Sequence, residues 1–163
     1  MIQVRRTLAV ERDAATVFAL ISDAARYPEF FAGITKWEPR SRKRRGVGAR
    51  FRVLMKVGSI EAGGTVVVEQ WEDERLIAWR SEAGLRQSGR WELEPTNTGA
   101  AVTLELEYDL SGGPVGWLVE RLVASIVGRN LLATLLAARR MLEFEQSDGE
   151  SEEEHEPATR GGS

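Results

Sequence analysis

Six strand-like segments follow one another between residues 34 and 110, and the links that join them are short. We place these strands at 34–42, 48–57, 60–71, 75–81, 87–94 and 100–110. Glycine, asparagine, aspartate and serine in the links favour tight turns. Parallel neighbours would need a long crossover connection, for which these links have no room. Successive strands must therefore be antiparallel neighbours in one sheet.

Alternation of apolar and polar residues shows that one face of this sheet is covered. In the last strand Leu106 and Tyr108 face one way, whereas Glu105 and Glu107 face the other. The same alternation at 2–10 predicts a seventh strand, half-buried like the others. One face of the sheet is thus exposed to water, and the opposite face needs a partner.

The partner is expected to be a helix that runs from Val115 to about Glu145, a segment without proline. Roughly 30 residues would make it about 45 Å long. Its broad apolar stripe is interrupted by Arg121, Arg129, Arg139 and Arg140. Each arginine would cost a few kcal/mol at the centre of a bilayer. We therefore predict a helix that covers the sheet rather than one that spans a membrane.

Two short helices are predicted between the first strand and the rest of the sheet. Asp13 can cap a helix that reaches Ser22, because its carboxylate accepts hydrogen bonds from the free amides of the first turn. The segment 27–31 reads as a second helix, with Pro28 near its start. The predicted architecture is a two-layer α+β fold, with a seven-stranded curved antiparallel sheet against one long C-terminal helix.

Composition limits the chain to one domain and a tail. The chain has 163 residues, of which 42% are hydrophobic, so we expect a domain at 1–146 and a disordered acidic tail at 147–163. It contains no cysteine, which excludes disulfides and thiol chemistry. Its one histidine, His155, lies in the tail. No metal or cofactor is expected, and a cytoplasmic location is the natural expectation.

Several short motifs, in this order along the chain, resemble those of one superfamily. They lie at 10–18 (VERDAATVF), 22–30 (SDAARYPEF), 46–48 (GVG), 75–79 (RLIAW) and 89–95 (GRWELEP). Together they resemble the START-like helix-grip (SRPBCC) superfamily, in particular polyketide cyclase/dehydrase-like and coenzyme Q-binding-like proteins. The resemblance covers residues 2–145. It implies a sheet wrapped around the last helix with a cavity between them, but it does not imply a reaction.

Strand parity predicts which side chains line that cavity. The inward residues are mostly apolar, and the candidates for ligand binding are Phe51, Val53, Met55, Trp79, Trp91 and Tyr108 from the strands, with Leu118, Leu122 and Ile126 from the last helix. In the superfamily the short helix at 27–31 resembles a lid, which adds Tyr27, Phe30 and Phe31. The polar exceptions are Gln70, Ser81, Gln87, Tyr108 and Asn130. No catalytic residue is assigned. All of the aromatic residues could equally be ordinary core.

Basic residues concentrate at 40–45 (RSRKRR), on the hairpin between the second and third predicted strands. This run could contact anionic lipid head groups, at about 1 kcal/mol for each base. It could also be a solvated loop that the acidic tail neutralises. No aromatic residue is interleaved in it and no nucleic-acid motif accompanies it, so DNA binding is not expected.

Three functions remain open from the sequence. The first is a protein that binds or carries a small hydrophobic ligand such as a lipid, a quinone or a polyketide-like compound, because a mostly apolar pocket with few polar groups suits such a ligand. The second is a polyketide cyclase or dehydratase, which would need Tyr108 and the polar inward residues. The third is a ribosome-associated or protein-binding module that uses the basic hairpin. The oligomeric state is left open.

Overall fold

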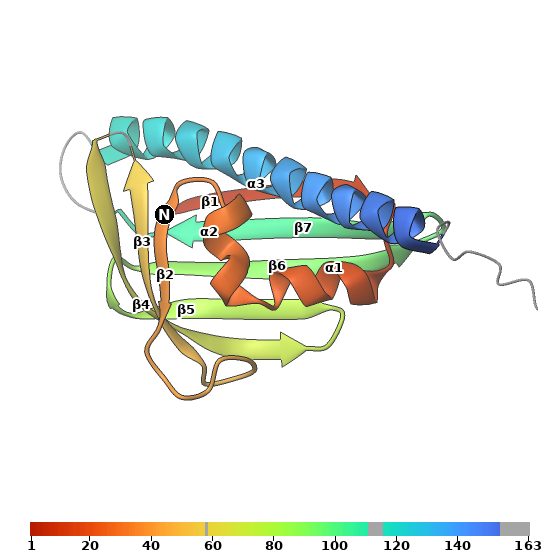
Figure 1. Cartoon of the computed structure of the whole chain (residues 1–163). Helices are drawn as coiled ribbons and strands as arrows, with labels where there is room; N and C mark the ends of the chain where they lie inside the picture. Colours follow the sequence, from red (N-terminus) through yellow and green to blue (C-terminus); the bar gives the residue numbers. More distant parts are fainter. Residues whose placement is uncertain (58, 111–115, 154–163) are drawn as a thin grey trace, which may run out of the picture.

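The computed structural model describes residues 1–57, 59–110 and 116–153, and within these ranges the side chains of 57, 60, 116–119 and 145–153 are not described. A curved sheet and one long helix dominate the fold (Figure 1). The elements are β1 (Ile2–Val10), α1 (Ala14–Ile21), the 3₁₀ turn η1 (Ala24–Arg26), α2 (Tyr27–Phe30), β2 (Ile34–Pro39), β3 (Arg50–Val57), β4 (Ile60–Glu72), β5 (Leu76–Gly84), β6 (Gln87–Thr96), β7 (Gly99–Tyr108) and α3 (Gly116–Glu153).

The sheet has seven strands in the order β1-β7-β6-β5-β4-β3-β2, and every neighbouring pair is antiparallel. Strands that follow one another from β2 to β7 are neighbours, as their short links require. The first strand joins the last one, with Ile2 opposite Tyr108 and Val10 opposite Ala100. The predicted helix-grip architecture is confirmed: the sheet curls, and α3 lies across its concave face (Figure 1).

Several predicted boundaries were wrong. The strand predicted at 34–42 ends at Pro39, and the one predicted at 75–81 continues to Gly84. The last helix continues beyond Glu145 to Glu153, so residues 147–153 of the expected tail are helical. No proline lies between Pro114 and Pro157 to stop the helix earlier. Residues 154–163 lie outside the described part of the chain.

Helix α3 contributes one face to the core. Its buried side chains recur at helical spacing, at Val127, Leu131, Leu135, Ala138 and Leu142. By length and composition the segment Glu120–Phe144 could cross a membrane. In this fold, however, its inner face packs along β1 and against β7 and α2.

The segment between β1 and β2 covers part of the same face of the sheet (Figure 1). Asp13 caps α1 as predicted, because its Oδ1 accepts a hydrogen bond from the Thr16 amide at 3.1 Å. The buried side of α1 packs against β6, β7 and α3. The Tyr27 hydroxyl then donates to the Ile21 carbonyl oxygen at 2.5 Å, which ties α2 back to α1.

Candidate functional site

A cluster of aromatic rings lies between the sheet and the α2 segment. The rings of Tyr27 and Trp37 are 4.7 Å apart between centroids, and those of Trp37 and Trp79 are 5.6 Å apart. Phe31 lies 5.9 Å from Trp91 in an edge-on arrangement. Four different elements, α2, β2, β5 and β6, together with the residue after α2, supply these rings. The cluster therefore joins the short helices to the sheet.

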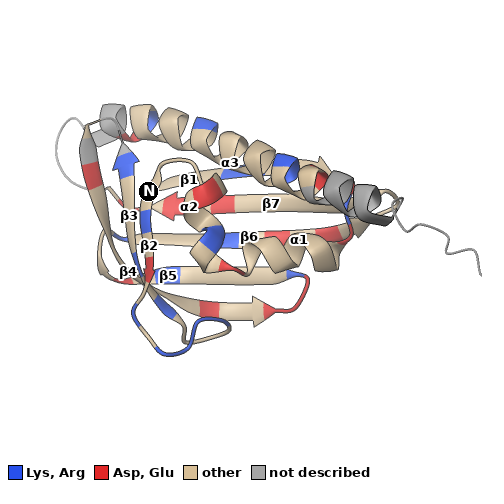
Figure 2. Cartoon of the chain, viewed as in Figure 1, with Lys and Arg blue, Asp and Glu red and all other residues tan. Residues whose placement is uncertain are grey.

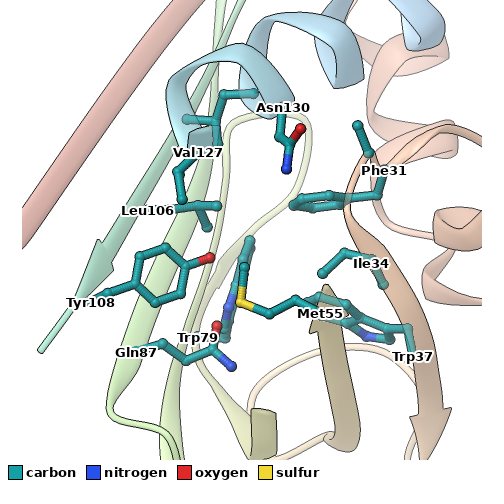
Figure 3. Close-up of a pocket in the computed structure, with 12 residues that line it drawn as sticks. Phe31, Ile34, Trp37, Met55, Trp79, Gln87, Leu106, Tyr108, Val127 and Asn130 are labelled. Carbon is teal, nitrogen blue, oxygen red and sulfur yellow. The ribbon is translucent and has the colours of Figure 1, made fainter. Parts of the chain in front are cut away.

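A small cavity lies beside this cluster, under α3 (Figure 3). Its volume is about 10 Å³, which is close to the space that one water needs. The lining is mostly apolar and consists of Phe31, Ala32, Ile34, Trp37, Met55, Trp79, Gln87, Leu106, Tyr108, Val127, Asn130 and Leu131. Figure 3 shows the Tyr108 hydroxyl and the Asn130 amide directed into this space.

Three buried donors of the lining have no hydrogen-bond partner: Trp37 Nε1, Trp79 Nε1 and Gln87 Nε2. By contrast, Trp71 Nε1 donates to Asp73 Oδ1 at 2.8 Å. A buried donor without a partner costs about 1–3 kcal/mol, so such groups in a native fold call for an explanation. All three residues border the cavity, so a molecule that entered it with acceptor atoms would lie close to these donors.

Further spaces lie next to this cavity and share lining residues with it or with one another. A second one of about 20 Å³ shares Trp37 and Trp79 with it and reaches Ser22 and Arg44. A larger pocket of about 430 Å³ shares Ser22, Ala24, Trp37, Arg44 and Phe51 with that one. On the other side, Gln87 and Tyr108 also border a surface depression of about 330 Å³. Trp37 thus borders both narrow inner spaces and the pocket of about 430 Å³, whereas Trp79 borders the two inner spaces alone.

One hydrogen-bonded contact holds the α2–β2 turn against α3. The Ala32 amide donates to Thr134 Oγ1 at 2.9 Å, and the Thr134 hydroxyl donates to the Asn130 carbonyl oxygen at 2.7 Å. Gly33 has a φ of 83°, and a Cβ there would lie 2.6 Å from Asn130 Nδ2. The turn can therefore approach α3 closely only with glycine at this position. This contact closes one side of the cavity.

The protein has two tyrosines, Tyr27 and Tyr108, and burial raises the pKa of both phenols. Because the folded pKa lies above the unfolded value of about 10, stability is complete below pH 10 and falls as the pH rises above it. We expect no tyrosinate absorbance near 295 nm from the native protein at pH 10.5, and a rise that coincides with unfolding at higher pH. Ionisation at pH 10 with native circular dichroism would contradict this burial.

The residues predicted to bind ligand divide into several groups. Phe31, Met55, Trp79 and Tyr108 line the first cavity, and Tyr27 and Phe51 line the second. Phe30, Val53 and Trp91 are buried but line neither. Leu122 is instead 60% exposed on the outer side of α3, and Ile126 is half-buried away from the lining. Leu118 lies outside the described side chains. Gln70, predicted to face inward, is exposed.

The first-cavity lining contains residues that were not among the predicted ligand contacts, in particular Ile34 and Trp37 of β2 and Val127 and Leu131 of α3. In β2 the register shifts between Ile34 and Lys36, so two residues three positions apart both border the cavity. In α3 Val127 is buried whereas Ile126, one of the predicted ligand contacts, is only half-buried. Among the described residues, no group of three or more His, Cys, Asp or Glu is placed to hold a metal ion.

Basic residues gather on the β2–β3 loop, where the sequence placed them (Figure 2). Arg45 Nη2 donates to Ser22 Oγ at 2.9 Å, and its guanidinium carbon lies 5.6 Å from the centre of the Trp71 ring. Arg44 borders both the second cavity and the outer pocket. The basic run therefore begins outside the site and ends at its edge.

Solved structures with the same fold include proteins of several kinds. A protein from Thermus thermophilus superposes with a TM-score of 0.76 at 22% identity, covering 88% of this chain and 98% of the other. The Zhui aromatase/cyclase from a Streptomyces species gives 0.69 at 20% identity, with coverage of 86% and 93%. A START superfamily protein from Mycobacterium smegmatis gives 0.67 at 19% identity, with coverage of 86% and 98%. At these identities the likeness concerns the fold alone.

Comparison with curated proteins finds no match. A family profile described as "Polyketide cyclase / dehydrase and lipid transport" matches residues 1–143, which is most of the chain. The matched part runs from the first strand through the buried face of α3. The chain therefore belongs to the polyketide cyclase/dehydrase and lipid transport family, and it shares its fold with a START superfamily protein.

Proposed function

We propose that this protein binds a small hydrophobic ligand with carbonyl or similar acceptor atoms, between the sheet and α3. The observation that carries the proposal is the set of unpartnered donors, Trp37 Nε1, Trp79 Nε1 and Gln87 Nε2, around an apolar cavity. A ligand that accepts hydrogen bonds from these groups would remove their cost and bury its apolar body at the same time. Quinones and polyketide-like compounds have this combination.

Ligand binding requires the inner spaces to widen, because ligand sites commonly have volumes of about 300–1,000 Å³ and the two inner cavities have about 10 and 20 Å³. The contact between the α2–β2 turn and α3 is the natural place for this change. In the described residues it is held by the hydrogen bond from the Ala32 amide to Thr134. Displacement of the turn would move Phe31 and Trp37, which border the cavity, away from α3.

A cyclase or dehydratase is the second candidate, and the Tyr108 hydroxyl favours it. Its raised pKa keeps the phenol protonated, so it could donate a hydrogen bond to a substrate carbonyl. The other polar side chains in the lining are Gln87 and Asn130, together with the indoles, and none of these is a general base. The lining therefore favours binding over catalysis. Loss of turnover in Tyr108→Phe with unchanged ligand affinity would support the cyclase function.

The test compares two ligands of similar shape, 2-methyl-1,4-naphthoquinone and 2-methylnaphthalene, by isothermal titration. We expect the quinone to bind about thirtyfold more tightly, because each of its two oxygens accepts from the free donors at about 1 kcal/mol. Gln87→Leu removes one of the free donors and should reduce this preference. Ser88→Ala is the control and should preserve it, because the Ser88 hydroxyl donates to Glu107. Equal affinity for the two ligands would contradict the role of the donors, and binding of neither would contradict the proposal.

A further inference from the structure

The outer pocket of about 430 Å³ combines an apolar inner side with charged residues at its edge. It lies between the β2–β3 loop and the α1–η1 segment, and its lining is Ser22, Asp23, Ala24, Ala25, Trp37, Pro39, Arg44, Arg45 and Phe51. Trp37 and Phe51 belong to the buried core. This one pocket therefore offers an amphiphilic molecule both apolar contacts and charged side chains.

The two arginines differ in how they are held. Arg45 is fixed by its hydrogen bond to Ser22 and by its position over Trp71. Arg44 has no carboxylate at ion-pairing distance in the part of the chain that the structure describes. Gly46 and Gly48 have φ values of 84° and 91°, which lets the loop turn back toward β3 just after these arginines. A guanidinium without a partner thus borders the pocket.

The outer pocket lies next to the inner spaces. It shares Ser22, Ala24, Trp37, Arg44 and Phe51 with the cavity of about 20 Å³. That cavity in turn shares Trp37 and Trp79 with the one beside Tyr108. An apolar chain that enters past Trp37 would therefore leave its other end beside Arg44.

We infer that the outer pocket holds an oxyanion head group, a carboxylate or a phosphate, of the hydrophobic ligand, with Arg44 and Arg45 as its partners. The inference rests on the proposed function and adds to it that the ligand is an anionic amphiphile. Guanidinium groups suit both anions, because their planar donors match two oxygens at once. Asp23, whose Oδ1 accepts from the Ala25 amide at 3.2 Å, opposes the anion from the same lining.

The test measures binding of dodecanoate, dodecyl phosphate and dodecanol below their micelle concentrations. Arg44→Gln should weaken dodecanoate binding about threefold to fivefold, as expected for an exposed ion pair, and leave dodecanol unchanged. Asp23→Asn keeps a capping side chain and should strengthen dodecanoate binding by about twofold. Arg42→Gln is the matched control, because it removes the same charge from the same loop outside the pocket lining. Dodecyl phosphate should respond as dodecanoate does, and a response of one ligand alone identifies the anion that the site accepts.

The outcomes separate the two proposals. If dodecanol and dodecanoate bind equally and Arg44→Gln changes neither, the head-group site is refuted while hydrophobic binding stands. If no ligand binds, the proposed function fails and the inference fails with it. If Arg42→Gln weakens dodecanoate binding as much as Arg44→Gln, the anion is attracted by the overall charge of the loop, and the head-group site in the pocket is refuted. Loss of binding to anionic vesicles in Arg44→Gln, with dodecanoate affinity unchanged, would assign the loop to a membrane surface and overturn the inference.

Discussion

Replacing Leu131 by alanine should lower the free energy of unfolding by about 2–5 kcal/mol in urea titrations. Leu131 is 1% exposed on the inner face of α3 and borders the cavity beside Tyr108. The truncation removes apolar contacts and leaves a larger hole, because the surrounding sheet can relax only in part. The effect tests whether this face of α3 completes the core.

The matched control is the next residue. Leu132 is 42% exposed on the outer side of α3, and Leu132→Ala should change the free energy of unfolding by less than about 0.5 kcal/mol. A one-residue step along a helix turns the side chain by about a quarter of a circle, so the pair isolates the orientation of α3. Equal losses in the two variants would mean that α3 is rotated from the position described.

Gly89→Ala should destabilise the fold by about 1–3 kcal/mol and weaken ligand binding at least about tenfold. A Cβ at Gly89 would overlap Trp79 Cζ2 and would lie 2.6 Å from Trp79 Cε2 and 2.7 Å from Leu106 Cδ2. Trp79 packs over this glycine on the neighbouring strand, where the two residues are paired. The indole would have to move into the cavity that it borders.

Gly128→Ala is the control for Gly89→Ala, because the same substitution at this position should not lower the stability of the fold. Gly128 lies in α3, and its new Cβ would meet the end of the flexible Arg6 side chain at 2.7 Å. Alanine favours a helix over glycine by about 1 kcal/mol, so thermal unfolding should be unchanged or shifted upward. Suppose that Gly89→Ala lowers neither stability nor quinone binding more than Gly128→Ala does. The position of the Trp79 indole would then not require a glycine at residue 89, which would contradict the account.

Much of the fold could be predicted because its strongest signals are local. Alternation predicts the strands, and the short links from β2 onward leave one order for β2 to β7, but the place of β1 beside β7 was not predicted. The Asp13 cap could also be predicted from the sequence, because an acceptor side chain just before an apolar helical segment accepts hydrogen bonds from the free amides of the first turn. The length of α3 was underestimated because the acidic composition after Ser147 favours disorder, although proline does not occur before Pro157.

The site was harder to predict because it depends on irregular strands. Parity assigned Gln70 to the inner face, but β4 has a register shift between Val68 and Gln70. The shift changes which face later residues occupy, so Gln70 is exposed and Trp71 packs against Phe18. A similar shift in β2 brings Trp37 into the lining, which parity did not predict. The sequence contains no local mark of either bulge.

The rotation of α3 was misjudged for a different reason. Leucine and valine occur on more than one side of this helix, so the apolar stripe is wide enough for several orientations. Leu122 fits the stripe as well as Leu131 does, yet only Leu131 is buried. Likewise, an indole N–H that has no acceptor close in sequence depends on other strands for a partner. Trp71 has Asp73 two residues away, whereas Trp37 and Trp79 have no such neighbour.

The most direct test of the central claim is the indole region of a nitrogen–proton correlation spectrum with ¹⁵N-labelled tryptophan, titrated with 2-methyl-1,4-naphthoquinone. A ligand whose oxygens accept from Trp37 and Trp79 should shift these two indole N–H signals downfield. Trp71 should remain in place, because its N–H already donates to Asp73. Signals of Trp37 and Trp79 that stay fixed up to the solubility limit, or a shift of Trp71 alone, would contradict binding of an acceptor-bearing ligand in this cavity.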